Sequence, residues 1–164
     1  MSFFNYDYYR IDEVSTNLWI TGMCAEGLWT LYDQVDKVAE HKFDAILNCA
    51  DFDLPVGLTN SIEDYAKLGI YDGERIPDGV VAKAVTFLEQ THGKGKRVLV
   101  HCAAGISRSV GMTAAYLAKK NKTTLHAAIN SIAVNRSCAN PHFAIQTSIE
   151  LYLREVRRPS GPLI

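Results

Sequence analysis

The sequence predicts an α/β fold: a central, largely parallel twisted sheet flanked by helices on both faces, with a helical C-terminal half. Two observations lead to this prediction. Up to residue 101, short apolar runs alternate with stretches whose apolar residues recur every three or four positions, the patterns of buried strands and amphipathic helices. After residue 102 the pattern is helical throughout. Strands that alternate with helices form parallel sheets covered by helices.

Four apolar runs bounded by Gly, Asn or Asp are predicted as strands. They cover residues 17–21, 45–50, 65–71 and 97–101, and the last is the clearest.

Helical spacing of apolar residues predicts five helices. The first covers residues 27–41, and Asp78 is expected to open the second, which ends before the glycines at 93 and 95. The other three cover residues 107–120, 124–135 and 143–156.

Length and composition favour one folded domain. The chain has 164 residues, of which 48% are hydrophobic and 21% charged. We therefore expect a single domain over residues 1–164 with a loose tail over 157–164. The opening aromatics are expected to pack against the domain; they are Phe3, Phe4, Tyr6, Tyr8 and Tyr9. No run is long enough to span a membrane and the start does not resemble a signal peptide, so we expect a cytoplasmic monomer.

The net charge of −1 provides no overall attraction to nucleic acid or to an anionic membrane, and neither partner is expected. The four cysteines have no C-x-x-C spacing, so no metal site and no cofactor are predicted. Cys24, Cys49 and Cys138 are interpreted as small buried side chains. Because Cys49 ends a predicted strand, a redox partnership with Cys102 is the alternative for that residue.

The segment 102–108 leaves a buried strand and leads into a helix. Backbone N–H groups in such a turn point inward and form an anion-binding nest, which the positive end of the helix dipole reinforces. The small residues Ala103, Ala104 and Gly105 allow the backbone to approach the anion closely. The segment therefore predicts a cradle for a phosphate-sized oxyanion.

A thiol and a guanidinium lie at the two ends of this cradle. Inward N–H dipoles and a nearby positive charge favour thiolate over thiol, so Cys102 is predicted to be a nucleophile. Arg108 carries a permanent charge on a planar fork that can hold two phosphate oxygens. An unpaired buried arginine is costly, which favours a bound anion or an acidic partner beside it.

The run His101-Cys102-Ala-Ala-Gly-Ile-Ser-Arg108-Ser109 resembles the signature of the cysteine-dependent protein tyrosine phosphatases. Its Gly-x-Ser-Arg-Ser form and the preceding Arg-Val-Leu-Val are similar to the dual-specificity branch. The resemblance extends to Leu47-Asn-Cys-Ala50 and to the helices after the signature, and so covers most of the chain.

The resemblance implies a role for each matching residue. Cys102 would form a phosphocysteine, Ser109 would assist departure of the thiolate, and His101 would order the loop and indirectly favour the thiolate without acting as a base. Phosphate oxygens would be bound by the loop residues Ala103, Ala104, Gly105, Ile106, Ser107 and Arg108.

The leaving oxygen needs a proton from a carboxylic acid on a nearby loop. Asp72, Glu74 and Asp78 are the candidates. Asp72 directly follows a predicted strand and so lies at the sheet edge where Cys102 emerges, and its position also resembles that of the family's acid. Asp78 has a competing explanation as a helix N-cap or first-turn acid. We therefore expect Asp72 to be the acid and rank Glu74 last.

The segment 135–146 resembles the family's loop before the last helix, but Asn140-Pro141 reverses the usual order. Asn140 is therefore interpreted as a turn residue. Two placements stay open for Arg136: at the border of the pocket, or solvated at a helix end.

These residues together predict a protein phosphatase that acts on phosphotyrosine, and on phosphoserine and phosphothreonine, in phosphorylated protein or peptide substrates. Three alternatives remain. An RNA 5′-triphosphatase and a phosphoinositide phosphatase would use the same signature, but the near-neutral charge and the absence of lysine from residues 103–107 disfavour them. A non-catalytic phosphate-reading module would need neither Asp72 nor Ser109.

Overall fold

A computed structural model of the chain describes residues 6–23 and 28–159. The expectations for Phe3, Phe4, Cys24 and the end of the tail (160–164) lie outside the described residues, and so does the side chain of Tyr6.

The sheet has five strands in the order β1-β2-β5-β3-β4. Their bounds are Asp12–Ser15 for β1, Leu18–Gly22 for β2, Ala45–Asn48 for β3, Asp64–Lys67 for β4 and Val98–Cys102 for β5. β1 runs antiparallel to β2, whereas β2, β5, β3 and β4 are parallel neighbours. The expected largely parallel sheet is therefore confirmed.

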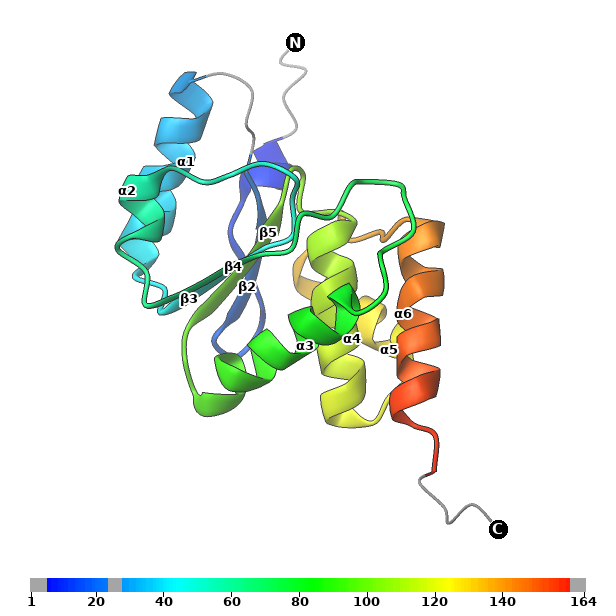
Figure 1. Cartoon of the computed structure of the whole chain (residues 1–164). Helices are drawn as coiled ribbons and strands as arrows, with labels where there is room; N and C mark the ends of the chain where they lie inside the picture. The colour runs from blue at the N-terminus through cyan, green and yellow to red at the C-terminus, as the bar shows by residue number, and fades with distance from the viewer. Residues whose placement is uncertain (1–5, 24–27, 160–164) are drawn as a thin grey trace.

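Within the described residues there are six α-helices, and they lie on both sides of the sheet, as expected. They are α1 (Leu28–His41), α2 (Val56–Thr59), α3 (Val80–Gln90), α4 (Arg108–Asn121), α5 (Leu125–Asn135) and α6 (Phe143–Val156). Figure 1 shows α1 and α2 on one side of the sheet and α3 to α6 on the other. Two short 3-10 helices, Tyr6–Tyr9 and His92–Lys94, complete the described elements.

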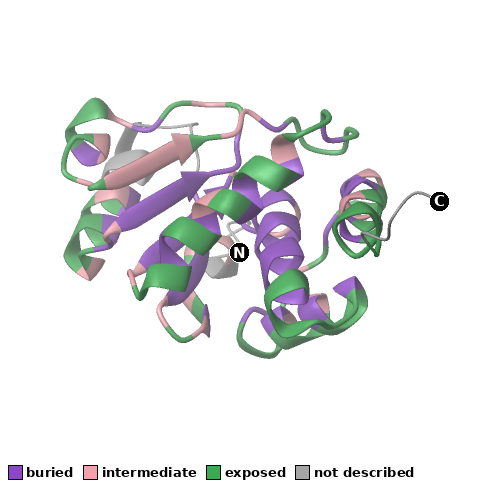
Figure 2. Cartoon of the chain, turned by 60° about the horizontal axis from the view of Figure 1, so that its bottom comes forward, coloured by how far each residue is buried: buried purple, intermediate pink, exposed green. Residues whose placement is uncertain are grey.

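Alternation along β5 explains the two layers. Val98 and Val100 pack into the larger apolar cluster, which contains residues of α3 to α6, while Leu99 between them joins the smaller cluster with Val38 of α1 and Leu58 of α2. Successive side chains of a strand point to opposite faces, and all three are fully buried. Figure 2 shows buried residues along the inner strands and on the inner faces of the helices, whereas the edge strand β4 has no buried residue.

Several element boundaries differ from the sequence prediction. β4 ends at Lys67, so the strand expected over residues 65–71 is too long. Asp78 does not open α3, because the N-cap is Gly79 with a φ of 85°. β1 and α2 were not predicted, since Asp-Glu-Val-Ser is mostly polar and α2 has only four residues.

The central strand β5 places Cys102 at the carboxyl edge of the sheet. Cys102 is in register with Gly22 at the end of β2, and its carbonyl oxygen accepts a bond of 2.8 Å from the amide of Met23. On the other side the Cys49 amide donates to the His101 carbonyl oxygen at 2.8 Å. Ligands of such sheets bind outside the carboxyl ends of the strands.

Candidate active site

The phosphate loop, defined here as residues 102–108, joins β5 to α4. It brings together three residues of the predicted site: Cys102, Arg108 and Ser109. The Cys102 side chain is buried, with 2% of the residue exposed. Its Sγ accepts a hydrogen bond of 3.2 Å from the Gly105 amide and lies 3.1 Å from Ser109 Oγ. A backbone donor and a hydroxyl directed at one sulfur can stabilise negative charge on it.

Two glycines allow the loop to close this tightly. Gly105 has a φ of +67°, a conformation that glycine adopts readily, and a Cβ there would lie 2.4 Å from Arg136 Nη2. A Cβ on Gly22 would lie 2.7 Å from the carbonyl carbon of Ala104 and 2.8 Å from the Ala103 carbonyl oxygen. The loop backbone therefore packs directly on the end of β2.

Arg108 begins α4, and its side chain is 6% exposed. Its Nη1 donates to Asp51 Oδ1 at 3.2 Å and to the Ile70 carbonyl oxygen at 3.0 Å. Its Nε is buried and has no hydrogen-bond partner among the described residues. The Nη1 side of the guanidinium is thus held by protein, and Nε offers a donor on the edge that suits bidentate phosphate binding.

The acidic partner of Arg108 is Asp51, a residue that was not singled out in the sequence. Asp51 lies three positions after the end of β3, and its side chain is 44% exposed. The sequence held only a partial signal: an acid shortly after a parallel strand lies at the carboxyl edge of the sheet, but the sequence does not show that this strand pairs with β5. Asp51 makes Arg108 a paired cation before any substrate binds.

The candidate acids Asp72, Glu74 and Asp78 are all exposed and lie between β4 and α3. Asp72 was expected to follow a strand directly, but β4 already ends at Lys67. Asp72 lies two residues after Ile70, whose carbonyl oxygen accepts a hydrogen bond from Arg108. Asp78 instead pairs with Arg75 Nη2 at 3.2 Å on the surface and caps no helix. Its expected capping role is therefore wrong, while the choice of Asp72 as acid stays a prediction.

The far side of the phosphate loop is held by the segment before α6. The Asn140 amide donates to the Ile106 carbonyl oxygen at 2.9 Å, and the His142 amide donates to Ser107 Oγ at 2.8 Å. Asn140 thus contacts the loop through its backbone amide. The turn in this segment lies at residues 137–138 and does not include Asn140, so its interpretation as a turn residue is wrong.

Burial sets the titration of two groups behind the loop. The pKa of His101 is lowered to about 4 by burial and by the positive charge of Arg108, although a bond to the Cys102 carbonyl oxygen opposes the shift. That bond is long, with 3.5 Å from Nδ1 to the oxygen. The pKa of Cys49 is raised well above its usual value, first by burial and then by Cys102. Both side chains are therefore neutral at physiological pH.

Arg136 is neither at the pocket border nor solvated. Its side chain is fully buried behind the phosphate loop, where its Nε donates to the Gly105 carbonyl oxygen at 2.7 Å and its Nη2 to that of Ala104 at 3.1 Å. The expectation of a solvated arginine fails because the loop carbonyls need buried donors.

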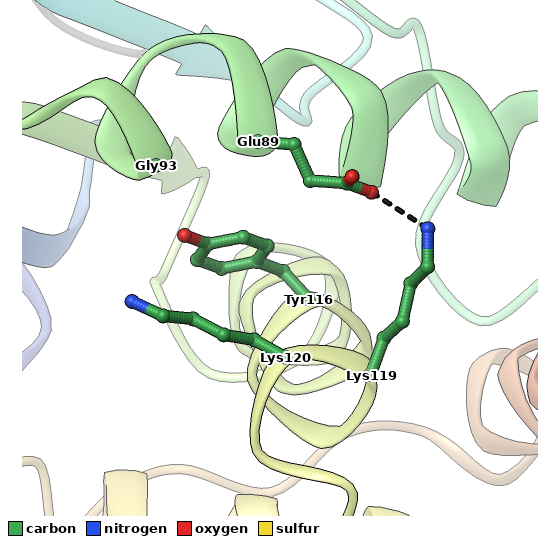
Figure 3. A pocket seen from close by; sticks show the side chains of 5 residues that line it. All are labelled: Glu89, Gly93, Tyr116, Lys119 and Lys120. Carbon is green, nitrogen blue, oxygen red and sulfur yellow. Dashed lines mark hydrogen bonds and ion pairs between the residues drawn. The ribbon is translucent and has the colours of Figure 1, made fainter.

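A hollow of about 310 Å³ lies elsewhere, between α3 and the C-terminal end of α4, and Figure 3 shows its lining. Lys119 pairs there with Glu89 at 2.8 Å, and Lys120 Nζ lies 5.8 Å from the centre of the Tyr116 ring. Because α4 begins at the phosphate loop, this hollow is at the opposite end of that helix from Cys102.

Within residues 6–23 and 28–159, no group of three or more His, Cys, Asp or Glu side chains is arranged to hold a metal ion. No helix in that part of the chain has the length and apolar character to span a membrane.

Comparison with known proteins agrees with this geometry. Residues 30–155 match the family model described as the dual specificity phosphatase catalytic domain. Human dual specificity protein phosphatase 5 is 39% identical over 80 residues, which cover 49% of this chain and 21% of the relative. The chain spans about a fifth of the length of the curated relatives it matches.

Solved structures share the fold at low sequence identity. The human tyrosine phosphatase-like serine/threonine/tyrosine-interacting protein has a TM-score of 0.71 at 20% identity, with 89% of this chain and 97% of that chain covered. PTPMT1 in complex with PI(5)P has a TM-score of 0.74 at 18% identity, with 89% and 96% covered. The family model covers most of the chain, which therefore belongs to the dual specificity phosphatase catalytic-domain family.

Proposed function

We propose that this chain is a protein phosphatase that hydrolyses phosphotyrosine, phosphoserine and phosphothreonine esters through a phosphocysteine intermediate. One observation carries the proposal: Cys102 Sγ lies 3.2 Å from the Gly105 amide and 3.1 Å from Ser109 Oγ, in a loop that ends at buried Arg108. A nucleophile, an oxyanion cradle and a phosphate-binding fork are thereby joined in one short segment.

In the first step the Cys102 thiolate attacks phosphorus. An S–P bond forms while the P–O bond of the ester breaks, and the leaving oxygen takes the proton of the Asp72 carboxyl group. Arg108 and the loop amides hold the non-bridging oxygens, where negative charge is stabilised by fixed donors.

In the second step water hydrolyses the phosphocysteine. The oxygen of water attacks phosphorus while the Asp72 carboxylate accepts a proton from that water. The S–P bond then breaks and inorganic phosphate is released. The hydroxyl of Ser109 donates a hydrogen bond to the departing thiolate, a role that its 3.1 Å contact with Sγ supports.

Two exposed aromatic side chains beside the phosphate loop support a peptide substrate. Tyr71 is 61% exposed and follows Ile70, whose carbonyl oxygen contacts Arg108; Phe143 is 79% exposed and follows His142, whose amide contacts Ser107. Exposed rings provide apolar contact area for a substrate side chain or backbone. We propose that these two rings contact the residues around the phosphorylated side chain.

The experiment that tests the proposal compares wild type with Cys102→Ser on phosphotyrosyl, phosphoseryl and phosphothreonyl peptides, a 5′-triphosphorylated RNA and a phosphoinositide, all in EDTA. Peptide turnover that disappears in the variant supports the proposal. Turnover of RNA or lipid alone would retain the chemistry and replace the substrate. Binding of vanadate without any turnover would indicate a phosphate-reading module.

A further inference from the structure

The buried guanidinium of Arg136 contacts two neighbouring carbonyls of the phosphate loop. Arg136 is the residue that follows α5, and none of its side chain is exposed. Its Nε donates to Gly105 O at 2.7 Å, and one N–H of Nη2 donates to Ala104 O at 3.1 Å. These carbonyls belong to the part of the loop that lies closest to Cys102 Sγ, since the Gly105 amide donates to that sulfur.

The other donors of the same guanidinium bind the N-terminal segment. Nη2 also donates to Tyr8 O at 2.8 Å, while Nη1 donates to Arg10 O at 2.8 Å and to Asp12 Oδ2 at 2.9 Å. An arginine side chain has five N–H donors, so all five are used by these contacts. The carboxylate of Asp12, with 10% of its side chain exposed, balances the buried charge.

Planarity of the peptide bond links these contacts to the site. The described residues contain no cis peptide bond, and in a trans peptide the C=O and the following N–H point in opposite directions. With the Ala104 carbonyl directed at Arg136, the Gly105 N–H must point away from Arg136, and it donates to Cys102 Sγ at 3.2 Å. By the same reasoning, the Gly105 carbonyl on Nε turns the Ile106 N–H away from Arg136.

We propose that Arg136 is a positioning residue of the phosphatase: it holds the loop carbonyls on the outside so that the amides of Gly105 and Ile106 face the sulfur and the phosphate. This inference rests on the proposed function, because it assigns those amides to a bound oxyanion. Arg136 touches neither substrate nor the reacting atoms and acts through the loop backbone.

Arg136→Lys tests the proposal. Lysine keeps the charge, but its single nitrogen cannot span both carbonyls as well as the N-terminal acceptors. We expect vanadate to bind at least about tenfold more weakly and kcat on a phosphotyrosyl peptide to fall at least about tenfold, as loss of a preorganised oxyanion donor does. Binding is measured by calorimetry well below the melting temperature of each variant.

Ile132→Ala is the matched control. Ile132 lies one turn earlier on α5 and is fully buried in the apolar core, so its truncation destabilises the fold without removing a donor from the loop. We expect it to lower Tm while vanadate binding and kcat stay near wild type. The proposal would be overturned if Arg136→Lys bound vanadate and turned over peptide as the wild type does. It would also be overturned if Ile132→Ala lost as much vanadate affinity and kcat as Arg136→Lys.

Two further measurements keep the test decisive. If Arg136→Lys does not fold, Asp12→Ala removes both the charge and the acceptor that hold Nη1 and should weaken vanadate binding in the same direction; unchanged binding contradicts the proposal. Vanadate binding needs no turnover. A wild-type protein that binds vanadate but hydrolyses no phosphopeptide would therefore refute the proposed function while the role of Arg136 in anion binding is still decided.

Discussion

Asp51 Oδ1 lies 3.2 Å from Arg108 Nη1, so a carboxylate from the loop after β3 partly neutralises the cation that begins α4. The contact has two opposite effects on phosphate binding. The hydrogen bond fixes one edge of the guanidinium and leaves Nε for a ligand, whereas the negative charge repels a dianion that binds to the other edge.

Asp51→Asn separates these effects, because the amide oxygen can still accept from Nη1 while the charge is lost. We expect inorganic phosphate to inhibit the variant about two- to fivefold more strongly, the range for a half-exposed charge pair. Asp53→Asn is the control, since Asp53 pairs with Lys67 at 2.8 Å and is 83% exposed. Weaker inhibition of Asp51→Asn would mean that the charge serves chiefly to anchor Arg108.

Asp72→Asn is expected to lower kcat/KM on a phosphotyrosyl peptide by about a hundredfold or more, the usual contribution of a general acid. An aryl phosphate whose leaving group needs no proton should be affected far less. The same pair of substrates is measured with Asp78→Asn, which removes an exposed acid that pairs with Arg75. If Asp78→Asn shows the selective loss, the assignment of the acid is wrong.

Ser109→Ala removes the hydroxyl that lies 3.1 Å from Cys102 Sγ. The second step should slow by about tenfold or more, because the departing thiolate loses a donor, and phosphoenzyme should accumulate. Rapid quenching and mass spectrometry of the intact protein would detect the added phosphoryl group on Cys102. A variant that hydrolyses peptides at the normal rate without accumulation would remove Ser109 from the mechanism.

His101 makes stability depend on pH. Its pKa is lowered to about 4 in the folded chain, mainly by burial, so between pH 4 and about 6.5 the unfolded chain binds more protons. Protonation of His101 in the unfolded chain therefore lowers the free energy of unfolding progressively as pH falls below about 6.5, and above that pH the residue has no such effect. We expect urea unfolding to give a free energy about 2 kcal/mol lower near pH 5 than near pH 7 from this residue alone. His101→Asn should remove that part of the dependence; an unchanged pH dependence would contradict it.

Cys49 is expected to remain reduced when brief peroxide treatment oxidises Cys102. Burial, followed by the effect of Cys102, raises the pKa of Cys49, and a protonated thiol is a poor nucleophile. Thiol labelling after denaturation, followed by peptide mapping, measures the state of each cysteine. Joint loss of label from Cys49 and Cys102, restored by a reductant, would instead establish a disulfide and the redox partnership.

The sequence predicted the parts of the site that lie close together in the chain. Cys102, Arg108 and Ser109 are brought together by one loop and the first turn of one helix, so their juxtaposition follows from local structure. The parallel sheet was also predictable, because alternating apolar periodicities determine both the elements and their layers.

Contacts between distant segments were not predictable in the same way. Arg108 meets Asp51 across 57 positions, and Arg136 meets Gly105 across 31. Strand order decides which loops share an edge, and one sequence does not give strand order. Polar β1 was missed for a related reason: its strand character comes from pairing with β2 and not from its own side chains.

The close packing at Gly22 has a consequence for inherited variation. A Cβ there would lie 2.6 Å from the Tyr8 carbonyl oxygen and 2.7 Å from the backbone of Ala104, so even alanine would push the phosphate loop away from the sheet. A single-base change in the Gly22 codon is therefore expected to displace the phosphate loop while every residue of the cysteine signature remains intact. Screens for loss-of-function alleles that read only the signature would count such a gene as active.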